Sequence, residues 1–129
     1  MPAETDLSAL LRGLSPRLNP GTFVYTCVPG GVPDGATPVV TVREDEGLTL
    51  VLPQGDADRL GLAYDFEAAW ITLQVHSALA AVGLTAAVSA VLTAAGISCN
   101  VVAGFTHDHL FVPVDRADDA LAAVAGLRP

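Results

Sequence analysis

The chain contains no lysine, and its only cationic side chains of high pKa are six arginines. Fourteen aspartates and glutamates bring the formal net charge to −8. Affinity for nucleic-acid phosphates and for anionic membrane surfaces depends on clustered basic side chains, so the sequence argues against both kinds of partner. The acidity by itself favours solubility and names no partner.

Long hydrophobic runs are also absent, and none of the apolar stretches reaches the length needed to cross a membrane. Residues 1–6 have neither a basic region nor a long apolar core, so they do not read as a secretory signal, and we expect a cytoplasmic protein. In a reducing compartment Cys27 and Cys99 would be thiols, and their apolar neighbours predict that both are buried. A disulfide between them stays open.

Sequence motifs of catalysis and cofactor binding are missing. The glycines are scattered, and no phosphate-binding loop or dinucleotide-binding pattern is present. Cys99 has no local signature of a nucleophile, so we expect no enzyme and no cofactor. His107 and His109 alternate around Asp108, which is compatible with a metal site completed by His76. The plainer interpretation, a polar hairpin turn, is the one we prefer, with no metal.

The hydrophobic pattern is what the chain has in quantity, because 51% of its 129 residues are apolar. That content predicts one domain or two small packed modules with a buried core. In the C-terminal half, residue spacing and Gly and Pro boundaries predict a strand at 70–75, a helix at 84–95, strands at 97–103 and 110–112, and a helix at 115–124. This order is that of a ferredoxin-like module, an α+β fold with an antiparallel sheet and helices on one face.

The N-terminal half repeats parts of this pattern. Val51-Leu52-Pro53 followed by Ala57 and Asp58 matches Phe111-Val112-Pro113 followed by Ala117 and Asp118. The chain is therefore predicted to consist of two related halves, 1–66 and 67–129, although a strand-proline-helix junction can also recur by chance. The predicted elements of the first half are a helix at 7–14, strands at 22–28, 39–44 and 48–52, and a helix at 54–60. Neither half has a full set of strands, so each should lean on the other or on a second chain.

Two motifs carry a resemblance to a known family. Gly83 opens a helix directly after a strand and loop, and Ala94-Ala-Gly-Ile-Ser-Cys-Asn100 is similar to an Ala-x-x-Gly-Ile-Asn ending. Together with the following hairpin and Val-Pro, they resemble the ACT domain, a ligand-sensing module that includes the regulatory part of aspartate kinases. The run Glu46-Gly-Leu-Thr-Leu-Val-Leu-Pro53 extends the resemblance to small free-standing bacterial proteins built from two such halves.

The resemblance implies an amino-acid site at the interface of paired modules. It points to the loop after the first strand of the second half, where a helix N-terminus can receive a carboxylate, and to the start of the following strand. The residues that it implies are His76, Ser77, Ala78, Leu79, Val82, Gly83, Leu84, Ser98, Cys99 and Asn100. Residues 76–82 include no acid, so the ligand's ammonium group would need another acceptor, such as Asp108, Asp65, Glu67 or backbone carbonyls.

We therefore expect a non-catalytic regulatory protein that binds a small molecule, most plausibly an amino acid, and forms a homodimer. The alternative is a structural or protein-interaction module that dimerises through its sheet edges and binds no small ligand. The polar side chains of Ser77, Ser98 and Asn100 separate these hypotheses. A ligand site requires them to face a cavity, whereas an interaction module would leave them in solvent.

Overall fold

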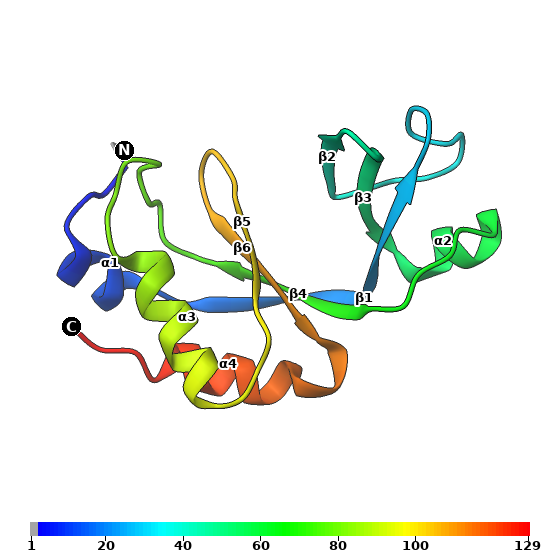
Figure 1. The fold of residues 1–129 in the computed structure, drawn as a ribbon. Coiled ribbons are helices and arrows are strands. Elements are labelled where there is room, and N and C mark those ends of the chain that lie inside the picture. The colour runs from blue at the N-terminus through cyan, green and yellow to red at the C-terminus, as the bar shows by residue number, and fades with distance from the viewer. Residues whose placement is uncertain (1–2) are drawn as a thin grey trace. The chain divides into compact units, whose positions relative to one another are not determined.

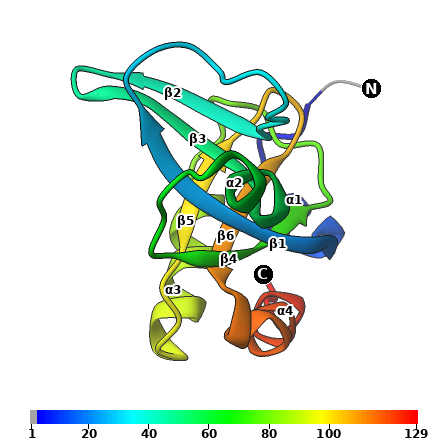
Figure 2. The same cartoon turned by 90° about the vertical axis from the view of Figure 1, so that its right-hand side faces the viewer.

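We describe residues 3–129 in a computed structural model of the protein (Figures 1 and 2). Helices and strands follow one another in the order that the sequence predicted. In order, they are α1 (Leu7–Gly13), β1 (Pro16–Val28), β2 (Val40–Glu44), β3 (Gly47–Pro53), α2 (Gln54–Leu60), β4 (Glu67–Leu73), α3 (Leu84–Ala94), β5 (Asn100–Ala103), β6 (Asp108–Pro113), the 3-10 helix η1 (Val114–Arg116) and α4 (Ala117–Ala125).

The strands form an antiparallel sheet in the order β2-β3-β1-β4-β6-β5. Strand β1 pairs with β3 from Phe23↔Pro53 to Val28↔Leu48, and β5 pairs with β6 from Asn100↔Phe111 to Ala103↔Asp108. The order β1-β4-β6-β5 supplies the second half with the strand that its own sequence lacks. The α+β, ferredoxin-like prediction is confirmed.

The chain divides into two compact units, which we describe separately. Unit 1 contains the residues up to Pro20 together with Ala69–Pro129, and unit 2 contains Gly21–Ala68. Strand β1 begins in unit 1 and continues into unit 2. The first twenty residues thus pack with the second half, so the units do not coincide with the predicted halves 1–66 and 67–129, and that division stays a prediction.

In unit 1, α3 and α4 lie on one side of the strands (Figure 1). Strand residues Ile71, Leu73, Leu110 and Val112 point toward these helices and are fully or almost fully buried. The beginning of β1 is joined to the end of β4 because the Gln74 backbone N–H donates to the Ser15 carbonyl at 2.7 Å. The helices contribute most of the remaining core residues, namely Leu10, Leu11, Leu84, Val88, Leu92, Ala120 and Val124.

Unit 2 has its own small core, in which α2 covers β1 and β3. The core residues are Val24, Val28, Leu48, Leu50, Leu52 and Ala57. Gly47, at the β2–β3 turn, has φ +146°, and a Cβ there would lie 2.6 Å from the Val28 carbonyl oxygen. Close packing of two backbones therefore requires glycine at this turn.

The loop at residues 29–38 is fastened to α2 by the Asp56 carboxylate. The Thr37 backbone N–H and hydroxyl donate to Asp56 at 2.8 and 2.7 Å, and these bonds, helped by Arg59, lower the pKa of Asp56. The Arg59 guanidinium also donates to the Gly35 carbonyl at 2.6 Å. The side chains of Asp56 and Arg59 thus hold this Pro- and Gly-rich loop against α2.

Several predicted boundaries were wrong. The strand predicted at 97–103 starts at Asn100, because the Ile97 N–H donates to the Leu92 carbonyl and closes the end of α3. The strand predicted at 70–75 is β4, which begins and ends earlier. The helix predicted at 115–124 is divided into η1 and α4.

The expected burial of both cysteines is also corrected. Both are free thiols, but Cys27 is exposed and Cys99 is only partly buried. Side chains alternate along β1, and Cys27 points away from the core that holds Val24 and Val28. Burial raises the pKa of the Cys99 thiol.

Candidate functional site

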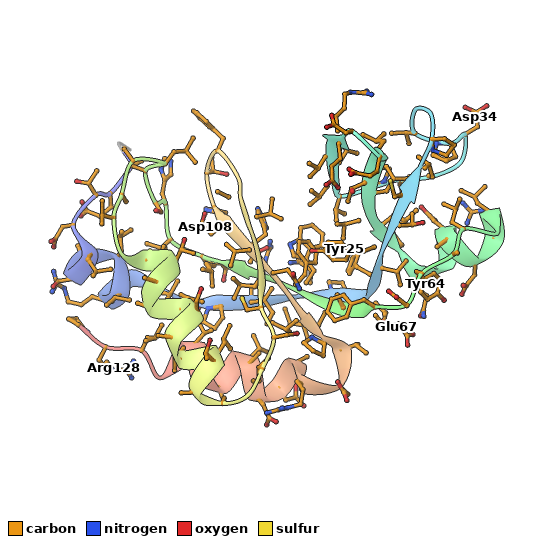
Figure 3. The ribbon with its side chains drawn as sticks, in the orientation of Figure 1. Tyr25, Asp34, Tyr64, Glu67, Asp108 and Arg128 are labelled. Carbon is orange, nitrogen blue, oxygen red and sulfur yellow. The ribbon has the colours of Figure 1, made fainter. Side chains whose placement is uncertain are left out.

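Unit 1 contains a pocket of about 130 Å³ where the loop at residues 74–83 meets the start of α3 and the β5–β6 hairpin. Figure 3 labels Asp108, which the hairpin contributes. Small and apolar residues form most of the wall. The lining residues are Ser77, Ala78, Leu79, Ala81, Gly83, Leu84, Thr85, Ala103 and Asp108.

The start of α3 forms one end of this pocket. Gly83 is the N-cap at φ +105°, and no side chain of the described residues caps the helix. The first four N–H groups of an α-helix have no partner inside the helix, and the helix dipole makes them attractive to an anion. The first helical residues, Leu84 and Thr85, line the pocket. This end can therefore receive a carboxylate.

A carboxylate of the protein faces the pocket from the hairpin. Asp108 opens β6, and its pKa is raised by burial, although the neighbouring His109 and His107 offset part of this effect. Within residues 3–129, its side chain has no ion-pair partner. Among the described lining residues, Asp108 alone has an ionisable side chain. The pocket therefore combines a site for a negative group with an acceptor for a positive group.

The residues before α1 hold the pocket loop in place. Glu4 forms a parallel β-bridge with Ser77, in which the Glu4 N–H donates to the His76 carbonyl at 2.9 Å and the Ala78 N–H donates to the Glu4 carbonyl at 3.0 Å. Leu7 packs so closely that a Cβ on Gly83 would lie 2.9 Å from its Cδ2 atom. These contacts fix Ser77, which is 9% exposed and donates to the Ala78 carbonyl at 3.3 Å.

The pocket brings together five of the ten residues predicted for the site: Ser77, Ala78, Leu79, Gly83 and Leu84. His76 and Val82 belong to the same loop without lining the pocket. Residues 98–100 do not line it either, because they lie at the start of β5, whereas the pocket is beside the end of that strand. Ser98 and Asn100 are exposed, and the Asn100 amide donates to the Phe111 carbonyl at 3.3 Å.

Sequence reasoning named Asp108 only as one substitute acceptor, and it missed Ala81, Thr85 and Ala103. The period of two along β6 could have identified Asp108, since residues 108, 110 and 112 share one face of the strand. Leu110 and Val112 lie in the helix-covered core, so Asp108 begins the same face. The approach of the hairpin to the loop had no signal in the sequence.

The two histidines of the hairpin make separate contacts. His107 Nδ1 lies 2.8 Å from the Thr106 carbonyl, whereas His109 lies on the sheet face away from the helices. There the Trp70 indole N–H donates to His109 Nδ1 at 3.0 Å, and burial lowers the pKa of His109. In the part of the chain that the structure describes, no three metal-ligating side chains are close enough to hold an ion.

None of the helices in residues 3–129 has the length and hydrophobicity required to cross a lipid bilayer. Comparison with protein families matches the chain twice, at residues 2–69 and 65–125, and both matches are to ACT domains. A search of curated proteins found no match.

Solved structures share the fold over most of the chain. A Vibrio cholerae protein of unknown function, described as a possible transport protein, is 46% identical, with a TM-score of 0.84 and 92% of each chain covered. An Agrobacterium tumefaciens protein is 21% identical, with a TM-score of 0.69 and 87% of each chain covered. The ligand-free regulatory subunit of aspartate kinase from Thermus thermophilus is 11% identical, with a TM-score of 0.63, covering 84% of this chain and 92% of that subunit.

Proposed function

The chain belongs to the ACT domain family, and we propose that it is a cytoplasmic, non-catalytic regulatory protein that binds a free amino acid in the pocket of unit 1. One observation carries this proposal. The uncapped start of α3 and the Asp108 carboxylate face the same small pocket. An amino acid presents one negative and one positive group, and these two features match them.

In the proposed complex, the ligand carboxylate accepts hydrogen bonds from backbone N–H groups at the start of α3. The ligand ammonium group donates to Asp108, and the Ser77 hydroxyl is within the same wall. No proton or covalent bond is transferred, so binding acts by favouring one arrangement of the protein over another. The similarity in fold to an aspartate kinase regulatory subunit supports a regulatory role.

A homodimer is part of the proposal. Strand β5 lies at the end of the strand order, and an edge strand offers unpaired backbone groups to a second copy. The exposed residues Ser98 and Asn100 at its start could then complete the pocket of the neighbouring chain, with Cys99 between them. Ser98→Ala tests this contribution to the neighbouring pocket. Because Ser98 is exposed, its replacement should leave the fold of the chain intact. We expect weaker ligand binding and an unchanged dimer.

Thermal unfolding against the twenty amino acids tests the function. A ligand that binds only the folded state stabilises it by about 2.7 kcal/mol at a hundred times its Kd. We expect a selective, concentration-dependent rise in Tm. Ala103→Leu, which fills the pocket from β5, should abolish that rise, whereas Ala90→Leu on the exposed side of α3 should preserve it.

The second candidate is an interaction module without a small ligand. The exposed side chains of Leu79, Val82 and Phe105 favour it, because apolar surface that is rich in large side chains often marks a protein contact. A flat amino-acid panel with a stable dimer would support this candidate. A selective Tm rise that Ala103→Leu abolishes would reject it.

A further inference from the structure

We infer that the pocket selects amino acids with small, uncharged, apolar side chains and rejects aspartate and glutamate. This inference rests on the proposed function and deepens it, because it names the ligand class from the charges and the surface around the site. Three features of unit 1 support it: the single charge in the pocket, the exposed apolar residues of the loop and hairpin that line it, and its volume.

Charge is the first feature. The Asp108 carboxylate is the one ionisable side chain among the described lining residues, and the α-ammonium group of a bound amino acid would neutralise it. A ligand with an acidic side chain would add a second negative charge. No arginine of the described residues lines the pocket to balance that charge, and partial desolvation strengthens the repulsion.

The exposed apolar residues of the two segments that line the pocket are the second feature. Leu79 and Val82, on the loop at residues 74–83, are 65% and 83% exposed, and Phe105, on the hairpin turn, is 85% exposed. We call these three residues the apolar rim. The loop and the hairpin that carry them both contribute residues to the pocket lining. Leu79 itself lines the pocket, so a ligand with an apolar side chain gains free energy by covering part of it, and a charged side chain does not.

Volume is the third feature. At about 130 Å³ the pocket is well below the roughly 300–1,000 Å³ of sites for drug-sized ligands. Small side chains form much of its wall, among them Ala78, Ala81 and Ala103. The carboxylate, ammonium group and Cα of an amino acid take up part of this space, which favours a short side chain over a long one. Alanine and valine are the probes that match.

Isothermal titration of the full chain at neutral pH tests the inference with alanine, valine, lysine, aspartate and glutamate. We expect valine or alanine to bind at least about tenfold more tightly than lysine, aspartate and glutamate, because one uncompensated charge costs on that order. Isobutylamine and isovalerate, which are valine without its carboxylate and without its ammonium group, should each bind more weakly than valine.

The possible outcomes distinguish failure of the proposed function from failure of the proposed ligand class. Failure of every amino acid to bind would overturn the proposed function together with this inference. Binding of aspartate or lysine as tightly as valine would leave the proposed function intact and overturn the ligand class. Equal binding of isobutylamine and valine would show that the start of α3 does not hold a carboxylate, and would overturn the proposed function together with the ligand class.

Two variants test the named residues. Asp108→Asn should weaken valine binding by about ten- to a hundredfold and narrow the discrimination against aspartate, whereas Asp34→Asn, in an exposed loop of unit 2, should change neither. Phe105→Ser should weaken valine binding more than alanine binding, and its 85% exposure makes loss of folding unexpected. Val42→Ser, on exposed β2, is the matched control. Unchanged valine affinity in both Asp108→Asn and Phe105→Ser would overturn the inference.

Discussion

The two helices α1 and α3 belong to the same unit but begin in opposite ways. At α1, the Asp6 carboxylate accepts a hydrogen bond from the Ala9 N–H at 3.1 Å, which is an ordinary side-chain N-cap. At α3, the N-cap is Gly83, which has no side chain. The nearest carboxylate to this start that lines the pocket, Asp108, comes from another strand and is not a cap.

We call the start of α1 closed, because a side chain caps it, and the start of α3 open, because its N-cap is a glycine. The same unit therefore contains one helix start of each kind. The negative group that α1 needs is part of its own sequence, so α1 has little to gain from a ligand. The N–H groups of α3 have no such group, and they lie beside a pocket with room for one. Helices in the two segments that match ACT domains therefore do not imply two equivalent sites, and variants at each helix start can test the difference.

The largest effect should come from placing a side chain at the open start. Gly83→Ala forces alanine into φ +105° and moves its Cβ to 2.9 Å from Leu7 Cδ2, so we expect a loss of about 1–3 kcal/mol in the free energy of unfolding, and weaker ligand binding. Urea denaturation and titration with valine measure the two quantities.

Gly96→Ala is the matched control for that variant. Gly96 also has positive φ, at +72°, but nothing lies within 4 Å of a Cβ there. It should cost about 1 kcal/mol and leave ligand affinity unchanged. If Gly96→Ala proved as harmful to binding as Gly83→Ala, the start of α3 would have no special part in the site.

A smaller effect is expected at the closed start. Asp6→Ala removes the cap of α1 and should cost about 1 kcal/mol of stability, because the Ala9 N–H loses its side-chain acceptor. Ligand affinity should not change, since the α1 start is not part of the pocket. Ser8→Ala, an exposed change in the same helix, serves as the control for stability. A marked loss of affinity in Asp6→Ala would contradict the separation of the two starts.

The sequence predicted the α+β class and the order of elements, because hydrophobic periodicity and glycine and proline boundaries are local signals. It failed at β1, where Pro16, Pro20 and Gly21 indicated a break. Strand β1 nevertheless runs through these residues. The Asn19 amide donates to the Trp70 carbonyl and to the Thr72 hydroxyl at 3.2 and 2.9 Å, so pairing across about fifty residues outweighs local propensity.

The candidate site, like the fold, could be predicted only in part from the sequence. The family resemblance implied residues 77–79, 83 and 84, and the adjacent strand, loop and glycine-initiated helix gave their place in the chain. Residues 98–100 were grouped with them through the family resemblance, yet the antiparallel β5–β6 hairpin places their end of β5 away from the pocket. Asp108 reaches the pocket only through tertiary packing of that hairpin, which no local pattern encodes.

The smallest predicted effect is a change in the free energy of unfolding when a carboxylate is replaced by an amide. Its sign should differ between Asp108, beside the start of α3, and Asp6, at the start of α1. Because burial raises the pKa of Asp108 in the folded protein, its ionised form is disfavoured there, so it destabilises the fold above that pKa. This penalty disappears as the pH falls below the pKa of the unfolded chain. The free energy of unfolding of Asp108→Asn should therefore exceed that of wild type by a few tenths of a kcal/mol at pH 7, a figure that allows for solvent screening. In acid the two free energies should be equal.

Urea denaturation of wild type, Asp108→Asn and Asp34→Asn across pH measures this difference, with Asp34→Asn expected to follow wild type throughout. Asp6→Asn should show no gain at neutral pH, because the Asp6 carboxylate already has its N–H partner. If Asp108→Asn were less stable than wild type at pH 7, the Asp108 carboxylate would have a stabilising partner in the folded protein. It would then not be available to a ligand ammonium group, and the proposal that the uncapped start of α3 belongs to a ligand site would lose the support of Asp108.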